Sequence, residues 1–401
     1  MTIDTPAVVL GAGANGLGVA RSLARARVPT WLLDTDASRP EMYTRAAKPL
    51  AMRALQGEVL IAELERFAST AFRGARPVLF MTQEETVRTV SQQRERLAGH
   101  YRFALPARET VDALQHKQGF QRLAEQHDAP IPPLVHVRTL EDLSGLARLH
   151  YPVVVKPGGR HAEYARRFKK AYRVEDAAQA EELVGRILPV MPDVVVQEWI
   201  EGPDSSIYFC LQYLDRQGRV TASFTGRKIR SWPPQTGGTA SCTAAREAHA
   251  ELSRLTEQFF RATGVVGMAS MEYKRDARSG AFRMVEPTIG RTDYQEEVAT
   301  LNGVNLPHAA WCSEVGAAFP EPVPAGRPQV WRVRSEDRQS AAAQKQSARQ
   351  GCEGAAGIAD ALWRGSDPVP GLVQGWRHVR RALQRRAAGM LPGSQTAGSK
   401  P

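Results

Sequence analysis

The stretch GMASMEYKRDARSGAFRMVEPT, residues 267–288, contains two strand-like segments around a turn-forming segment. Residues 267–275 and 281–287 are the strand-like parts, and the segment DARSG at 276–280 is rich in turn-forming residues. Such a pattern is typical of a β-hairpin. We therefore predict an antiparallel pair of strands here, with one glutamate on each strand.

The register of this hairpin decides how the two glutamates lie. A five-residue loop over 277–281 would pair Asp276 with Phe282 and would place Glu272 directly opposite Glu286. Their Cβ atoms would then lie about 5 Å apart, and the carboxylates would repel each other unless a cation lay between them. Mg²⁺ binds one or two carboxylates together with substrate phosphates, so the pair is a candidate magnesium site. An exposed hairpin with a two-residue turn, which would offset the pair, remains open.

Residues 7–34 have the pattern of a strand, a glycine-rich turn, a helix and a second strand. Gly11, Gly13 and Gly16 match the spacing GxGxxG, and Asp34 follows where an acid that binds a ribose would lie. On its own this unit indicates a dinucleotide, so an NAD(P)-dependent oxidoreductase remains one reading. The same turn can also bind another anion, such as a substrate carboxylate.

A candidate phosphate site follows the β-branched run at 153–155. The sequence Lys156-Pro157-Gly158-Gly159 places an ammonium at the end of a strand, beside glycines whose amides can approach phosphate oxygens closely. An ordinary solvent-facing lysine is the alternative.

The segment VVVQEWIEGPD at 194–204 predicts a strand that turns into a loop and resembles a nucleotide-binding hinge. Backbone groups near Trp199 and Ile200 would pair with an adenine, and a carboxylate slightly further on would accept the ribose hydroxyls. The next strands lead to three cations in four residues, Arg227, Lys228 and Arg230. These are either a clamp for phosphate or carboxylate or a solvated strand edge.

The composition favours a globular protein. The chain has 401 residues, 42% of them hydrophobic, and contains neither an apolar run long enough to span a bilayer nor an N-terminal secretion signal. Its four cysteines lack the CxxC spacing of a zinc site. We expect a cytoplasmic protein.

The net charge of +11 is unevenly distributed. Residues 371–401 hold five arginines and Lys400 but no acidic residue, so +6 of the +11 lies there. Hydrophobic residues recur beside these arginines at helical spacing, at Val373, Trp376, Val379 and Leu383. The pattern predicts a basic amphipathic helix, either solvated or in contact with an anionic membrane surface or a protein partner. Because no module with interleaved aromatics accompanies the charge, we do not expect nucleic acid as a partner.

The order and spacing of these motifs resemble the ATP-grasp superfamily over residues 5–315. The matching motifs are Lys117, VKPGG at 155–159, QEWIEGPD at 197–204, Met271-Glu272 and VEPT at 285–288. The segment GRKIR at 226–230, followed by Pro233-Pro234 and Gly237-Gly238, is similar to the predicted carboxylate-amine ligases that include the D-aspartate ligase group.

The resemblance implies an α/β and α+β fold with a Rossmann-like domain preceding a two-lobed ATP-grasp fold. The implied parts are the Rossmann-like domain at 1–105, a lobe with the glycine loop at 106–196, a lobe with the metal site at 197–320, and a C-terminal extension with the basic helix at 321–401. In such proteins the first unit helps to hold substrate rather than NAD, which assigns Gly13 and Asn15 to substrate binding.

The resemblance also implies roles for individual residues. The residues implied to bind ATP are Lys117, Lys156, Gly158, Gly159, Glu198, Ile200 and Asp204, with Glu201 as an alternative to Asp204 at the ribose. The implied ligands of Mg²⁺, or alternatively Mn²⁺, are Glu272, Glu286 and Thr288. Thr288 stands where the family usually has Asn, although a hydroxyl can also coordinate magnesium. The residues implied to bind substrate or act in catalysis are Arg227, Lys228, Arg230, Lys156 and Arg291.

The implied reaction is the ATP-dependent ligation of a carboxylate and an amine. The carboxylate is phosphorylated to an acyl phosphate, and the amine then displaces phosphate to give an amide. Small-molecule carboxylate and amine substrates are thus the expected partners, with a second copy of the chain in a homodimer as a further candidate. A degenerate ATP-grasp protein that binds nucleotide or acts as a scaffold remains open because of Thr288.

Overall fold

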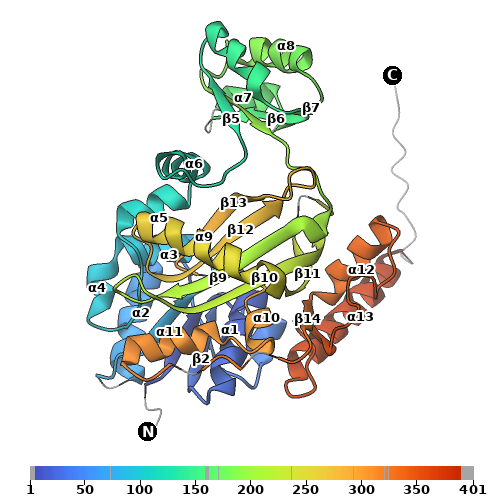
Figure 1. The fold of residues 1–401 in the computed structure, drawn as a ribbon. Helices are drawn as coiled ribbons and strands as arrows, with labels where there is room; N and C mark the ends of the chain where they lie inside the picture. The colour runs from blue at the N-terminus through green and yellow to red at the C-terminus, as the bar shows by residue number, and fades with distance from the viewer. Residues whose placement is uncertain are drawn as a thin grey trace, which may run out of the picture.

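The computed structural model describes residues 5–389 apart from 73, 159–161, 170, 236, 292, 320 and 324. Its strands form three sheets with the orders β3-β2-β1-β4, β5-β8-β6-β7 and β13-β12-β9-β10-β11-β14-β15. The first and third sheets make up the body of the molecule, and the second forms a small lobe that stands apart from it (Figure 1).

The N-terminal sheet is parallel and has the helices typical of a Rossmann-like unit. Its strands are β1 (Ala7–Leu10), β2 (Thr30–Asp34), β3 (Lys48–Ala51) and β4 (Val78–Met81), and its main helices are α1 (Ala14–Arg25), α2 (Gly57–Ala71) and α3 (Glu84–Gln92). The predicted βαβ unit is therefore confirmed as β1, α1 and β2. Gly16 is required in it, because a Cβ there would lie 1.9 Å from the carbonyl oxygen of Gly11.

The small lobe is an antiparallel sheet covered by helices. Its strands are β5 (Leu134–Val137), β6 (Val153–Pro157), β7 (Tyr172–Val174) and β8 (Val194–Glu198), and its helices are α7 (Ala162–Arg167) and α8 (Ala177–Ile187). Their valines, together with side chains of α8, form a separate hydrophobic core. Helix α6 (Lys117–Gln126) lies between this lobe and the body (Figure 1).

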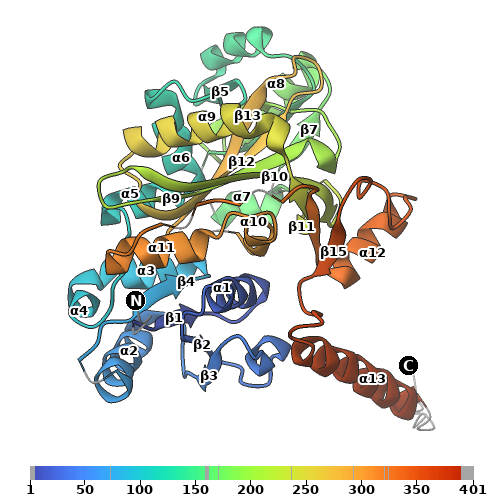
Figure 2. The ribbon, with the colours of Figure 1, turned by 60° about the horizontal axis from the view of Figure 1, so that its bottom comes forward.

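The seven-stranded sheet is the centre of the molecule. Its strands are β9 (Ile207–Leu214), β10 (Val220–Trp232), β11 (Gly238–Ala244), β12 (Gly267–Arg275), β13 (Phe282–Ile289), β14 (Gln329–Arg332) and β15 (Gly357–Asp360). Helices α9 (His249–Ala262) and α5 (Arg108–Leu114) pack on one face. Helices α10 (Glu297–Leu301) and α11 (Leu306–Val315) separate the other face from the N-terminal sheet (Figure 2). Strands β14 and β15, from the segment expected to be a C-terminal extension, complete one edge of this sheet.

The hairpin of β12 and β13 has the predicted pairing at its glutamates. Glu272 lies directly opposite Glu286, as expected, but Phe282 pairs with Arg275 and not with Asp276. The difference arises because the amide of Asp276 donates to the carbonyl of Ala281 within the turn, and a bulge between Glu272 and Tyr273 restores the register.

Two further helices follow β14. Helix α12 (Arg334–Ala343) packs on β10, and α13 (Val369–Gly389) begins against the short helix η1 (Pro40–Tyr43). None of the helices in the described ranges is long and apolar enough to cross a membrane.

Candidate active site

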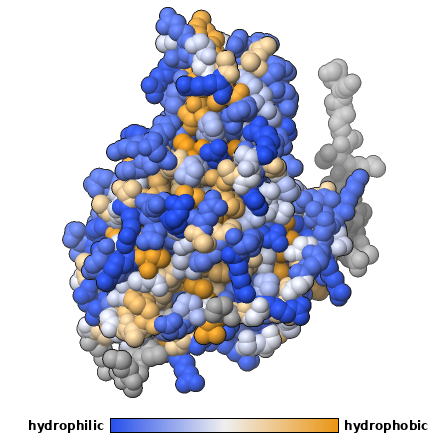
Figure 3. Space-filling view, viewed as in Figure 1, coloured by the Kyte–Doolittle hydropathy of each residue, from blue (hydrophilic) through white to orange (hydrophobic). Residues whose placement is uncertain are grey.

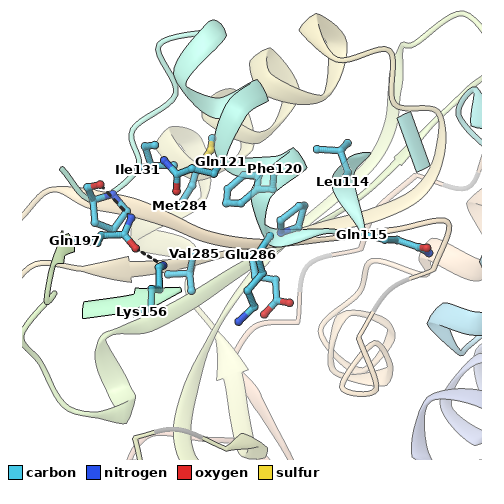
Figure 4. A pocket seen from close by; sticks show the side chains of 13 residues that line it. Leu114, Gln115, Phe120, Gln121, Ile131, Lys156, Gln197, Met284, Val285 and Glu286 are labelled. Atoms are coloured by element: carbon cyan, nitrogen blue, oxygen red, sulfur yellow. Dashed lines mark hydrogen bonds between the residues drawn. The ribbon is translucent and has the colours of Figure 1, made fainter. Parts of the chain in front are cut away.

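A pocket with about 700 Å³ of empty space, partly open to solvent, lies where the small lobe meets β13 and α6. Its polar lining comes from Lys117, Lys156, Gln197 and Glu286. Figure 4 shows Lys156 and Glu286 next to Val285 and below the apolar side chains of Ile131, Phe120 and Leu114. In the space-filling view, apolar side chains are exposed between the small lobe and the body (Figure 3). The pocket thus combines an apolar wall with cationic groups and a carboxylate.

The structure brings the two predicted phosphate-binding lysines to this pocket. Lys156 Nζ donates a hydrogen bond to Gln197 Oε1 at 2.7 Å, and Gln197 Nε2 donates to the carbonyl of Pro132. Burial, and secondarily the charge of Lys117, lower the pKa of Lys156 to about 8. Each ammonium group disfavours the charged form of the other, and an anion bound between them would stabilise both charges.

The glycine loop is placed only in part. The amide of Gly158 donates to the carbonyl of Asp193 at 2.8 Å, and a Cβ on this glycine would lie 2.5 Å from the carboxylate of Asp193. Gly158 is therefore required for packing against Asp193, and its amide is not directed at a ligand, contrary to the prediction. Gly159 lies outside the described residues.

The side chain of Glu198 holds the predicted adenine hinge in place. Glu198 is buried and accepts hydrogen bonds from the backbone amide of His150 at 2.8 Å and from its ring Nδ1 at 2.9 Å. The amide of Trp199 donates to the carbonyl of Pro152. In the part of the chain that the structure describes, the amide of Ile200 makes no backbone hydrogen bond, so it is available to an adenine. Glu198 thus positions the hinge, with one carboxylate oxygen bound by His150 and the other 3.7 Å from Arg278 NH2.

Asp204 does not fit its predicted role at the ribose. Its carboxylate is 2% exposed and accepts from the amides of Ser231 and Gln235 and from Gln344 Nε2. Both oxygens therefore hold β10, the following turn and the segment after α12 together. Glu201, the alternative, is 39% exposed and forms an ion pair with Arg173.

The glutamate pair lies next to a buried lysine. Lys228 Nζ lies 2.8 Å from Glu272 Oε2 and is 4% exposed, so it neutralises one of the two carboxylates. Burial raises the pKa of Glu272; Lys228 opposes that shift, whereas Asp293 and Glu286 add to it. The ion pair with Lys228 thus offsets only part of the cost of burying the Glu272 carboxylate.

The donor set at this position fits a divalent cation that takes most of its ligands from phosphates. Glu272 and Glu286 face each other, while the Thr288 hydroxyl donates to Asp293 Oδ1 at 3.1 Å. Over the described ranges, no group of three or more His, Cys, Asp or Glu side chains is placed to hold a metal ion. Two carboxylates without further protein ligands suit Mg²⁺, which retains water and phosphate ligands.

Two residues near this site were missed by the sequence analysis. Lys274 lies two positions after Glu272 on β12, so the two side chains share a face. Its Nζ lies 5.4 Å from the centre of the Trp199 ring, and burial lowers its pKa despite the nearby carboxylate of Glu201. The alternation along the strand would have identified Lys274. Asp293, by contrast, follows β13 in a loop and carried no such signal.

The three predicted clamp cations do not act together. Arg230 is fully buried, forms an ion pair with Asp337 at 2.7 Å, and donates to the carbonyls of Gln350 and Ala348. The pairing of β10 with β11 shifts register between Lys228 and Arg230, so strand alternation no longer places them on one face. These contacts argue against the assignment of Arg230 to substrate binding and catalysis. Arg227 is half-buried and, by alternation, faces away from Lys228.

The N-terminal candidates lie away from the pocket. Gly13 precedes α1, and buried Asn15 donates through Nδ2 to the carbonyl of Thr82 at 3.4 Å; neither residue lines the pocket. Asp34, the acid proposed for a dinucleotide ribose, accepts from the amides of Ala12 and Asp36. One oxygen holds the glycine turn through Ala12 and the other holds the segment after β2 through Asp36, so the geometry argues against NAD(P) at this position.

Arg291 lies in the segment after β13 and contacts Asp293. Its guanidinium NH1 lies 3.7 Å from Asp293 Oδ1, and its side chain is 20% exposed. Asp293 therefore connects Arg291 and Thr288, two residues that the sequence analysis assigned separately.

Comparison with protein-family models finds no match for this chain, and comparison with curated proteins finds none. Solved structures do match. Phosphoribosylglycinamide synthetase from Anaerococcus prevotii superposes with a TM-score of 0.61 at 12% identity, over 81% of this chain and 79% of that one. N5-carboxyaminoimidazole synthetase from Staphylococcus aureus gives 0.59 at 12% identity, over 81% of both chains.

A third similar structure carries ligands. The biotin carboxylase domain of the Hydrogenobacter thermophilus 2-oxoglutarate carboxylase, a dimer in complex with MgADP, ADP and bicarbonate, gives a TM-score of 0.58 at 13% identity, over 81% of this chain and 73% of that one. All three are ATP-grasp enzymes. The superpositions cover 81% of this chain, and the chain therefore has the ATP-grasp fold.

Proposed function

We propose that the chain is an ATP-dependent carboxylate-amine ligase that forms an amide and releases ADP and phosphate. The observation that carries this proposal is the convergence of Lys117, Lys156 and Glu286 on one pocket, with Glu286 directly opposite Glu272. Cations suited to phosphate thus lie beside carboxylates suited to Mg²⁺. Complexes with ADP or MgADP among the similar structures support the same ligand class.

The proposed roles follow from where each side chain lies. Glu272 and Glu286 would hold Mg²⁺, or Mn²⁺, which when bound neutralises charge on the phosphates. Lys117 and Lys156 bind the phosphates from the side of the small lobe, and the Ile200 amide pairs with the adenine. Arg291, which pairs with Asp293, would stabilise the transferring phosphoryl group.

The proposed reaction has two steps. A carboxylate oxygen of the first substrate attacks the γ-phosphorus, the bond to ADP breaks, and an acyl phosphate forms. The amine nitrogen of the second substrate then attacks the acyl carbon, phosphate leaves, and the nitrogen loses a proton to solvent. Closure of the small lobe on the pocket would keep water from the acyl phosphate.

From the order of the motifs we also propose a relation to the D-aspartate ligase group. We keep the domain limits that the resemblance implies, except that β14 and β15 belong to the central sheet and not to a C-terminal extension. Of the cations in the segment GRKIR, only Lys228 contacts the glutamate pair, because Arg230 is buried in an ion pair with Asp337. Substrate selection must therefore depend on other residues around the pocket.

The decisive experiment is a screen for ADP release with carboxylates and amines supplied in pairs, followed by mass spectrometry of any product. For the active pair we expect Glu286→Gln to abolish ADP formation, since it removes half of the carboxylate pair. Glu182→Gln, at an exposed glutamate on α8, is the matched control and should leave the rate unchanged. If Glu286→Gln released ADP at the parent rate, the assignment of Glu286 as a metal ligand would be wrong.

A nucleotide-binding protein without ligase activity is the second candidate. Two observations favour it: the Thr288 hydroxyl is engaged by Asp293, and Glu272 is engaged by Lys228. Mg²⁺-dependent binding of ATP without ADP release across the whole screen would select this candidate over the ligase.

A further inference from the structure

Helix α13 exposes a continuous apolar stripe. Leu372, Trp376, Val379 and Leu383 are 57%, 63%, 58% and 60% exposed. At 100° per residue these four positions fall within an arc of about 60° on the helix surface. Val373, which the sequence analysis placed in this stripe, is half-buried, and Leu372 takes its place.

A different face of α13 attaches it to the body. Pro370 is buried, Gly371 packs against Trp363, and Arg377 donates to the carbonyl and hydroxyl of Ser38. From residue 378 onward, every side chain of the helix that the structure describes is exposed. Figure 2 shows the helix extending away from the body. The stripe is therefore additional to the surface that holds the helix in place.

The charge of this segment determines which partner suits the stripe. Residues 371–401 contain five arginines and Lys400 but no acidic residue. The Arg380 guanidinium lies 5.6 Å from the centre of the Trp376 ring, at the margin of the stripe. A second copy of α13 would bring arginines together without a compensating acid. An anionic lipid surface offers both an apolar boundary for the stripe and negative charge for the arginines.

We propose that α13 docks the protein on an anionic bilayer surface. The stripe enters the boundary between headgroups and acyl chains, with the Trp376 ring at the level of the headgroups, where tryptophan is favoured. The net positive charge of the segment is attracted to lipid phosphates and carboxylates. This docking does not depend on the proposed ligase activity, because none of its residues lines the pocket.

The test is sedimentation of the full chain with vesicles of phosphatidylcholine alone or with about one third phosphatidylserine. We expect binding only to the anionic vesicles, with affinity falling as salt rises. The double variant Trp376→Ser/Leu383→Ser should bind at least about tenfold more weakly, because two large apolar side chains leave the interface. Arg380→Glu should weaken binding at low salt more than at high salt.

His378→Ser is the matched control, since this exposed residue lies on the side of α13 opposite the stripe. It should bind as the parent does, and circular dichroism should be the same for all variants. Absence of binding to anionic vesicles overturns the proposal. A concentration-dependent dimer that is lost in the Trp376→Ser/Leu383→Ser variant, in a protein that ignores vesicles, would instead assign the stripe to a second copy of the chain.

Discussion

At the scale of single residues, burial makes the protonation of Lys156 depend on whether an anionic ligand is bound. The neighbouring charge of Lys117 and the loss of solvent favour the neutral amine, whereas a phosphate in the pocket would favour the ammonium. Proton uptake and nucleotide binding should therefore be linked.

The first prediction concerns the pH dependence of this linkage. Because the pKa of Lys156 is lowered to about 8, the free protein loses the ammonium as pH rises through that value. The affinity for ADP should fall over the same range, as measured by calorimetry from pH 7 to 9. Lys156→Gln should bind more weakly and lose this component of the pH profile, while Lys48→Gln, at an exposed lysine, should keep it. An unchanged profile in Lys156→Gln would separate this residue from the phosphates.

The second prediction concerns the ion pair of Lys228 and Glu272. Replacing Lys228 with Met leaves a mostly buried carboxylate without its cation, and we expect a loss of about 2 kcal/mol in the free energy of unfolding. The double variant Lys228→Met/Glu272→Met should recover most of that loss, as measured by urea denaturation. If the single and double variants are equally unstable, packing of the lysine stem, and not charge, explains the effect.

At the scale of secondary-structure elements, bulges decide which side chains reach the site. The bulge in the hairpin preserves the pairing of Glu272 with Glu286, whereas the irregularity in β10 separates Arg230 from Lys228. Arg230 consequently anchors α12 through Asp337.

The third prediction tests that anchoring role. Asp337→Ala should cost about 3 kcal/mol in the free energy of unfolding, because it leaves the fully buried Arg230 guanidinium without its carboxylate. Binding of ADP by the folded fraction should stay at the parent value, measured at a temperature where the variant is native. Weaker ADP binding without a loss of stability would instead indicate that Arg230 acts in the active site.

Local features such as bulges explain why some parts of the fold and the site could be predicted from the sequence and others could not. Hydrophobic patterning and turn residues were enough for the first βαβ unit, for strands β6 and β8 of the small lobe and for the glutamate pair. Bulges are not visible in such patterns, so the alternation argument failed at Arg230. Nor does a single sequence reveal which carboxylates are satisfied internally, which is why Asp204 was assigned to a ribose although it accepts three hydrogen bonds from distant segments.

At the scale of the whole molecule, the small lobe has its own hydrophobic core and meets the body around the pocket. A ligand that contacts Lys156 on the lobe and Glu286 on the body would hold the two together. Lobe closure is then a direct consequence of ligand binding.

The fourth prediction is a more compact molecule when MgADP is bound. Small-angle X-ray scattering should show a lower radius of gyration with MgADP than without it. ADP in the presence of a chelator should produce a smaller change, because the carboxylates then lack their bridging cation. Equal scattering in all three conditions would mean that the lobe does not move.

The completion of the central sheet by β14 and β15 also sets an order of events during synthesis. Strand β14 pairs with β11, and Asp367 accepts hydrogen bonds from Arg21, Thr44 and the amide of Arg45, so one end of the chain is fastened to residues made more than 300 positions earlier. A nascent chain still missing these segments leaves the edge of β11 unpaired and the Arg21 guanidinium without the Asp367 carboxylate. Synthesis must therefore proceed past residue 367 before these contacts can form, and until then the exposed strand edge is open to pairing with other chains.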